Sequence, residues 1–370
     1  MSFSAWKMSK KWKIYQKTTL LSAIAFITSC NNTSQNSYDL TKFGASYTGR
    51  QFIPQSMPTV ATSYIAKSGQ IINQQDFLTQ LDNVRHYSTR LANQYAVTYG
   101  KITSWLAAGG RLQELTRYGV QLNQMRGQDG YQNVMMTGYF VPIIEARTTP
   151  QGEFRYPIYA IPQGNKKYSR SEIYQGALNG RGLELAYSNS LLDNFLMEVQ
   201  GSGFVHIGDG NLRHFAYGDK NGYSYTSIGR LLVEAGEIEK EKMSVQAIRQ
   251  WAERNPNKLQ GLLERNQSFV YFRPDATFDV KGSAGVPLVA LASVASDRNI
   301  VPSGSVLLVE MPLIDHNGNW RGRHELRLMV ALDVGGAVKG QHFDIYQGIG
   351  EKAGHQAGLM KHFGRVWVLN

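Results

Sequence analysis

The sequence predicts a mainly β protein with helices, in the α+β class. Thirty-seven glycines and many short β-branched runs favour strands and tight turns. Apolar residues at helical spacing occur near 73–119 and again in 243–255. Beyond the N-terminal leader, about 340 residues are enough for two domains with cores of their own.

The first segment has the composition of a secretory leader. Residues 1–17 hold five lysines and no acid, residues 18–29 are apolar or small, and Cys30 follows directly. We predict a signal peptide over 1–29, too short to remain as a membrane span. Without it the net charge falls from +11 to +6, which suits an anionic cell-wall polymer; no nucleic-acid motif is present.

Cys30 is the only cysteine, so no disulfide can form within the chain. The string Ile27-Thr-Ser-Cys30 resembles the lipobox of bacterial lipoproteins, in which the thiol is acylated and becomes the mature N-terminus. By that resemblance, Asn31 favours the outer membrane, with the protein anchored on its periplasmic face. We interpret 30–69 as the acylated cysteine and a polar tether. The alternative is a secreted protein with a stray cysteine.

The region that follows is helical in pattern. One helix face is expected from 77 to 95, with Asp76 in its first turn. Further helical segments are expected over 102–108 and 111–118, the last ending near Gly119. We expect these helices to cover one side of a barrel and assign them no chemistry.

Residues 128–162 are the first strongly β region, with strands expected over 133–142, 143–146 and 155–162. Gly138 and Tyr139 form a pair at which a sugar ring could lie against an aromatic face. The alternative is that this aromatic belongs to the core.

A glycine-rich string, Gln200-Gly-Ser-Gly203, precedes a strand expected over 204–207. Glycines flanking Ser202 let the backbone approach a ligand, and the Gln and Ser side chains can bond sugar hydroxyls and amides. The alternative is a corner between strands without a ligand. A serine-hydrolase elbow is disfavoured because the glycines are adjacent to the serine and no α/β pattern surrounds it.

Later segments return to mixed structure. A short helix is expected through Leu231 and Leu232, and a second over 243–255 with Ser244 as its cap. Strand character resumes over 266–273, where we place a domain boundary. A strand over 305–312 leads to a hairpin turn at 315–319 with Asn-Gly at its tip.

The stretch 327–350 organises the chain. Two apolar runs, 328–332 and 343–346, each carry one aspartate, Asp333 and Asp344, and a segment with three glycines and Lys339 joins them. This predicts two strands and a tight connection. Carboxyl groups cost free energy in apolar surroundings, so this pair suggests a catalytic role. The alternative is that both cap turns or pair with surface Arg and Lys.

Six strings taken together resemble the family of lytic murein transglycosylases that carry a C-terminal 3D module, over about 70–369. One departure is Val141, where a polar residue is expected. The strings are Thr137-Gly-Tyr-Phe140, Val199-Gln-Gly-Ser-Gly203, Tyr223-Ser-Tyr-Thr-Ser-Ile-Gly-Arg230, Asp297 with Ile300-Val-Pro-Ser-Gly304, Leu332-Asp-Val-Gly-Gly-Ala-Val-Lys-Gly340 and Phe343-Asp-Ile-Tyr346.

The resemblance implies a double-psi β-barrel domain built from 70–138 and 271–370. A smaller β-barrel domain, 139–270, would be inserted into it, with a substrate cleft between the two. The partner implied is the glycan strand of peptidoglycan, with the membrane reached through Cys30 and cell-wall synthases or scaffold proteins as further partners. We expect a monomer.

The resemblance also implies cleavage of the β-1,4 bond between N-acetylmuramic acid and N-acetylglucosamine without water. One carboxyl would act as acid and then as base; Asp344 is implied in that role, with Asp333 as its neighbour. Asp297 would have a structural or supporting role, and no cofactor or metal is implied. The substrate contacts expected are Thr137, Gly138, Tyr139, Gln200, Gly201, Ser202, Gly203 and Lys339.

Other readings of single motifs are weaker. Asp333-Val-Gly is similar to the Asp-Thr-Gly of aspartic peptidases but occurs once. Gly348-Ile-Gly350 imitates a dinucleotide loop, although only 17 residues follow Ala353, too few for the helix, strand and acid required. The eight histidines show no paired ligand spacing. The open alternative is a non-catalytic, peptidoglycan-binding lipoprotein.

Overall fold

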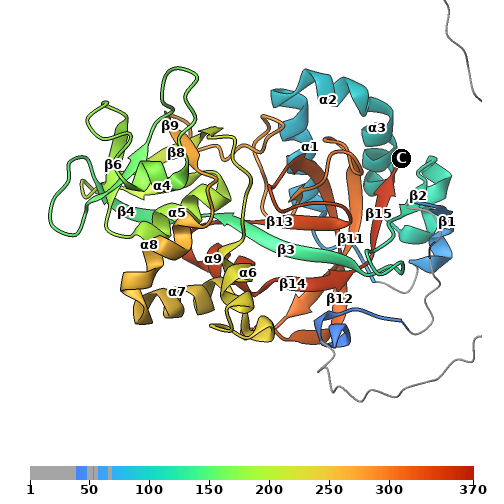
Figure 1. Cartoon of the computed structure of the whole chain (residues 1–370). Helices are drawn as coiled ribbons and strands as arrows, with labels where there is room; N and C mark the ends of the chain where they lie inside the picture. Colours follow the sequence, from blue (N-terminus) through green and yellow to red (C-terminus); the bar gives the residue numbers. More distant parts are fainter. Residues whose placement is uncertain (1–38, 48–52, 54–56, 66–68) are drawn as a thin grey trace, which may run out of the picture. The chain divides into compact units, whose positions relative to one another are not determined.

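Strands from both ends of the described chain build one nine-stranded sheet (Figure 1). The computed structural model describes residues 39–47, 53, 57–65 and 69–370. In sheet order the strands are β1 (Thr59–Val60), β2 (Leu122–Gln124), β15 (Val366–Leu369), β11 (Val306–Ile314), β12 (Trp320–Asp333), β10 (Ser293–Ala295), β13 (His342–Ile349), β3 (Val134–Val141) and β14 (Lys361–Gly364).

The connection between β12 and β13 differs from the expected tight turn. β10 lies between these strands, parallel to β12 and antiparallel to β13, so residues 334–341 must pass over its end. The apolar runs were correctly predicted as strands. The strand between them was not predicted, because runs buried on both faces do not reveal which strands lie next to them.

A second sheet of six strands is built from the middle of the chain. Pro142 alone separates β3 from β4, so the first sheet continues directly into the second. In sheet order its strands are β5 (Tyr156–Tyr159), β6 (Glu184–Ser188), β4 (Ile143–Arg147), β7 (Gly203–His206), β8 (Leu212–Lys220) and β9 (Val270–Asp275).

Helices accompany both sheets, as Figure 1 shows for α1, α2 and α3 beside the first and for α4, α5 and α8 beside the second. The α-helices are α1 (Gln74–Tyr87), α2 (Thr89–Gln94), α3 (Ala96–Ala107), α4 (Arg170–Tyr174), α5 (Leu191–Gln200), α6 (Ile228–Glu234), α7 (Val245–Arg254), α8 (Pro256–Glu264) and α9 (Gly350–Leu359). The 3₁₀ helices are η1 (Leu40–Phe43), η2 (Thr62–Tyr64), η3 (Leu112–Tyr118) and η4 (Lys240–Lys242).

The mixed α+β class is therefore confirmed, while the closure of each sheet into a barrel stays a prediction. The first sheet is buried on both faces. On β12, Leu328 and Val330 pack with α1 and α3, whereas Met329 and Ala331 face a cluster with β13. The alternation of Cβ direction along a strand produces these two cores from one apolar run.

Several expected helices have different bounds. The apolar face expected from 77 to 95 is split, because the Ser88 side chain accepts from Leu91 N and begins α2. The segment expected over 111–118 is the 3₁₀ helix η3, and a helix, α9, does follow Gly348-Ile-Gly350. Ser244 caps α7 as predicted, with its side chain accepting from Ala247 N.

The leader 1–29 and Cys30 lie outside the described residues, as does part of the tether 30–69. Within the described ranges, no helix has the length and apolar character needed to cross a membrane.

Candidate active site

Asp333 and Asp344 lie in one row across three strands. Each is in register with Ala295 of β10, Asp333 from β12 and Asp344 from β13. Neighbouring strands are about 4.8 Å apart, which places the two Cα atoms roughly 10 Å apart. A register shift precedes Ala295 on this row, and the two carboxyl groups reach the same face: Thr137 and Tyr139, two residues apart on β3, bond Asp344 and Asp333 respectively. The structure therefore brings the predicted carboxyl pair together.

Asp344 is held by a side chain from the strand on its other side. It is in register with Thr137 of β3, and Thr137 Oγ1 donates to Asp344 Oδ1 at 2.7 Å. Burial raises the pKa of Asp344 to about 7, the Thr137 hydrogen bond opposes that rise, and the charge of Asp333 adds to it. Although its side chain remains partly accessible, this carboxyl can hold a proton near neutral pH.

His342 is a site residue that sequence reasoning missed. Its Nε2 lies 2.8 Å from Thr137 Oγ1, and its ring also bonds the backbone of Ala337. Burial lowers the pKa of His342, so the imidazole is neutral near pH 7. The available signal was its position two residues before Asp344 on one strand, which puts both side chains on the same face.

Asp333 is fixed by three hydrogen bonds. Tyr139 Oη donates to Oδ2 at 3.0 Å, while the backbone N–H groups of Ser283 and Val334 donate to Oδ1 at 2.9 and 2.8 Å. Burial raises the pKa of Asp333 although these donors oppose the rise. Ser283 was missed because nothing in its sequence links it to a strand end 50 residues away.

The Tyr139 ring belongs to the core. It is 9% exposed and packs against Tyr346 with ring centroids 5.3 Å apart. Burial raises the pKa of its phenol well above the ordinary value, with the Asp333 and Asp344 charges adding to the effect. Its hydroxyl serves Asp333, and the expected contact between this ring and a sugar stays a prediction.

Two of the predicted site glycines are explained by packing. A Cβ on Gly138 would lie 2.8 Å from Ala357 Cα, so its absence allows α9 to approach β3. A Cβ on Gly203 would lie 2.3 Å from Met197 Sδ. Contacts shorter than 3 Å cannot be accommodated without a shift of the backbone or the neighbour.

The string 200–203 joins a helix to a strand, rather than two strands. Gly201 has φ 86° and ends α5, and β7 begins at Gly203. Gln200 Oε1 accepts from Phe140 N at 2.9 Å, which ties the string to the residue after Tyr139. Ser202 remains partly accessible beside this contact.

Asp297 holds the connection after β12. Its Oδ2 accepts from Gly340 N at 3.0 Å and its Oδ1 from Asn299 N at 3.1 Å. These donors hold the pKa of Asp297 below its usual value, with a smaller contribution from nearby Lys339. The structural or supporting role expected of Asp297 stays a prediction, and Lys339 is exposed at the same connection.

Other features of the described ranges include two cavities, one of which borders the Asp333 site through Ser283. No group of three His, Cys, Asp or Glu side chains there could hold a metal ion. One cavity, of about 470 Å³, lies among residues of the second sheet and its helices, and another, of about 270 Å³, is lined in part by Ser283 and Arg298. Neither is lined by Asp333 or Asp344.

Family models match two parts of the chain. The MltA specific insert domain matches residues 135–169 and 163–273. The 3D domain matches residues 292–370, which contain both aspartates and His342.

Two relatives are similar over most of their length. Membrane-bound lytic murein transglycosylase A of Escherichia coli (strain K12) is 54% identical over 304 residues, 81% of this chain and 83% of the relative. The protein of that name from Vibrio cholerae is 46% identical over 324 residues, 86% and 88% of the two chains.

Solved structures show the same arrangement. E. coli MltA with bound chitohexaose has a TM-score of 0.82 at 49% identity and covers 89% of this chain and 98% of its own. A membrane-bound lytic murein transglycosylase from Agrobacterium tumefaciens has a TM-score of 0.71 at 27% identity, covering 85% and 97%.

Proposed function

Because the chain belongs to the MltA family of lytic murein transglycosylases, we propose that it cleaves the β-1,4 bond between N-acetylmuramic acid and N-acetylglucosamine in peptidoglycan. The bond breaks without water, when the C6 hydroxyl of the muramic acid attacks its own C1. The product is a 1,6-anhydromuramic acid end. The chitohexaose bound to the E. coli relative supports a glycan strand as the substrate.

Asp344 supplies both proton transfers. A glycosidase that uses water or a protein nucleophile needs two carboxyl groups. Here the protonated Asp344 gives its proton to the leaving oxygen, and the resulting carboxylate takes the proton of the C6 hydroxyl. The observation that carries this proposal is the Asp344 carboxyl, whose pKa is raised to about 7 mainly by burial. Beside it lies the Thr137 hydroxyl, which can bond this carboxyl with or without its proton.

Thr137 can bond Asp344 in both protonation states. Its one hydroxyl proton can serve only one neighbour at a time. When Asp344 is a carboxylate, Thr137 donates to Oδ1; when Asp344 carries a proton, the hydroxyl can turn to Nε2 of neutral His342. The carboxyl therefore keeps its position while its charge changes, as an acid that becomes a base requires.

Asp333 acts on Asp344 through its charge. Its three hydrogen bonds fix the carboxyl, and negative charge there raises the pKa of Asp344 further after the effect of burial. Partly accessible Ser202 and exposed Lys339 are the substrate contacts we favour, whereas Gly138 and Gly203 act by allowing close packing.

The membrane attachment we propose is an acyl chain on Cys30 at the periplasmic face of the outer membrane. The lipobox-like string and the membrane-bound relatives support it. Radiolabelled palmitate incorporated by the wild-type chain and not by Cys30→Ala is the expected result; equal labelling of the two would contradict it.

The reaction is tested by mass spectrometry of purified peptidoglycan after digestion. The chain from residue 31 onward retains the whole compact unit 39–370. We expect muropeptides with anhydro ends, about 18 Da lighter than hydrolysed ones by loss of one water, from the wild type and from Asp297→Asn, and none from Asp344→Asn. Reducing ends would mean hydrolysis. Binding without cleavage by the wild type would favour the non-catalytic lipoprotein.

A further inference from the structure

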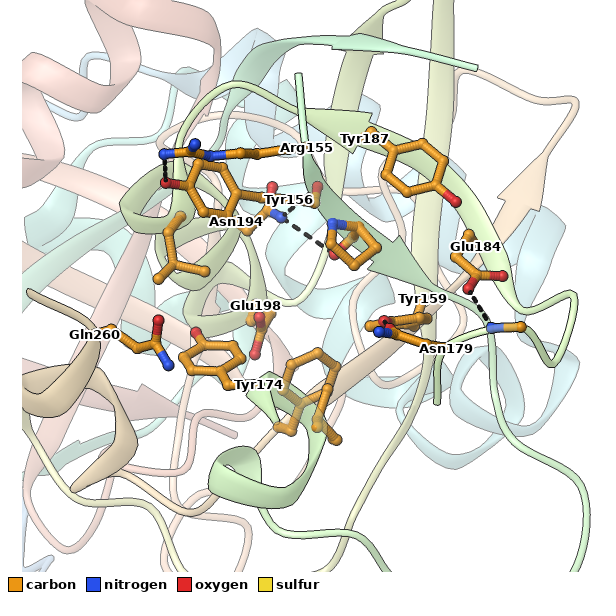
Figure 2. Close-up of a pocket in the computed structure, with 15 residues that line it drawn as sticks. Arg155, Tyr156, Tyr159, Tyr174, Asn179, Glu184, Tyr187, Asn194, Glu198 and Gln260 are labelled. Atoms are coloured by element: carbon orange, nitrogen blue, oxygen red, sulfur yellow. Dashed lines mark hydrogen bonds between the residues drawn. The ribbon is translucent and has the colours of Figure 1, made fainter. Parts of the chain in front are cut away.

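A cavity of about 470 Å³ lies apart from the two aspartates (Figure 2). Its walls come from β5, β6, α4, α5 and α8, together with the segments after α4 and before β9. The volume is in the range of small-molecule sites. The mechanism derived above uses none of its residues.

The wall of this cavity is largely aromatic. Tyr156, Tyr159, Tyr174, Tyr187 and Phe269 all line it. Tyrosine rings offer apolar faces together with hydroxyls that can bond a ligand, and such walls suit ligands with both apolar and polar groups.

One buried acceptor in the wall has no partner. Asn194 is 5% exposed, and its Nδ2 donates to the carbonyls of Tyr156 at 3.2 Å and Pro157 at 3.3 Å. Both donor bonds fix the orientation of the amide. Asn194 Oδ1 then has no hydrogen-bond partner among the described residues. That oxygen is covered by protein atoms, so the groups of the wall that a ligand can reach are the tyrosine rings and the two charged side chains at its edges.

Two opposite charges flank the cavity. Arg155 and Glu184 lie on opposite sides of the side chains drawn in Figure 2. Within the described part of the chain neither belongs to a salt bridge: Arg155 donates to Tyr156 Oη at 3.1 Å, and Glu184 accepts from Gly180 N at 3.3 Å. The deeper Glu198 is neutralised by Arg170 at 2.7 Å.

We propose that this cavity binds the peptide stem of peptidoglycan as a zwitterion. A carboxylate of the stem pairs with Arg155 and an ammonium group with Glu184. An uncharged sugar would form no ion pair with Arg155 or Glu184, so we favour the peptide stem over the glycan as the ligand. This assignment rests on peptidoglycan being the substrate.

Binding is measured by isothermal titration with the free stem peptide that an amidase releases from peptidoglycan. The variants are Arg155→Gln and Glu184→Gln, both at accessible positions. Exposed Arg254→Gln and Glu253→Gln on α7 are matched controls of the same charge change. We expect each cavity variant to weaken binding about tenfold and the controls to leave it unchanged.

Three results would overturn the site: no saturable binding, equal binding by the cavity variants and the wild type, or binding of peptide-free glycan strands that the cavity variants lose. Anhydro-end formation from those peptide-free strands is measured separately and should be unchanged in Arg155→Gln and Glu184→Gln. Peptide binding without anhydro ends from the wild type would contradict the proposed function and support the site.

Discussion

Thr137 donates its hydroxyl to Asp344 across two parallel strands, at 2.7 Å. Thr137→Val keeps the shape and removes this bond, which holds the pKa of Asp344 down. We expect that pKa to rise above about 7. The pH at which activity begins to fall on the alkaline side should therefore be higher in the variant than in the wild type. The rate should fall about ten- to hundredfold because the carboxylate loses its donor. Initial rates of anhydro-end formation from pH 5 to 9 test this, with Thr137→Ser as the control; an unchanged profile would contradict it.

Asp333→Asn removes a negative charge near Asp344 and keeps an oxygen that can accept from Ser283 and Val334. Burial is the main cause of the raised pKa of Asp344, and the Asp333 charge contributes further. We therefore expect this pKa to fall in the variant and the loss of activity to begin at lower pH. The same pH series measures it. The pH–activity profile of Asp297→Asn should match that of the wild type. If the profile of Asp333→Asn moved toward higher pH, the Asp333 charge would not be raising the pKa of Asp344.

Asp344→Asn should increase stability at neutral pH. In the folded chain the pKa of Asp344 is raised from 3.8 to about 7, so the folded state resists its ionisation. Protonation of Asp344 stabilises the folded chain fully below about pH 4, and this contribution to the free energy of unfolding is lost as the pH rises toward 7. The variant carries no such loss. Its free energy of unfolding should exceed that of the wild type by on the order of 2–4 kcal/mol at pH 7.5 and by little at pH 4. Urea unfolding of the wild type and the variant at pH 7.5 and at pH 4 measures this difference. An equal difference in the free energy of unfolding at the two pH values would contradict the raised pKa of Asp344.

Gly138→Ala should loosen the contact between β3 and α9. The added Cβ would lie 2.8 Å from Ala357 Cα, a backbone atom that cannot turn aside. We expect the free energy of unfolding to fall by about 1–3 kcal/mol. Gly261→Ala is the matched control: it lies inside α8 with nothing within 4 Å of the added Cβ and should stabilise by about 0.5–1 kcal/mol. Loss of glycan binding by Gly138→Ala at full stability would instead support the ligand role predicted from sequence.

The sequence predicted the two aspartates on separate strands because each stands at a fixed place in an apolar run. It could not predict β10 between them, since a three-residue strand buried on all sides carries no periodicity. His342 and Ser283 were not predicted for a related reason. His342 contacts Thr137 and Ser283 contacts Asp333 only in the folded chain, where distant segments are brought together. The cavity beside Asn194 was equally hidden, because its wall joins segments from Arg155 to Phe269.

The strand order also makes the site depend on pairings between segments that are far apart in the sequence. β15 ends one residue before the C-terminus, yet it pairs with both β2 and β11 inside the sheet. Pairings between distant segments form slowly, because closing the long loop between them costs conformational entropy. Asp344 meets Thr137 through a pairing of the same long range. Assembly of the carboxyl site therefore depends on a pairing between residues 207 positions apart in the sequence, so the site should form late in folding.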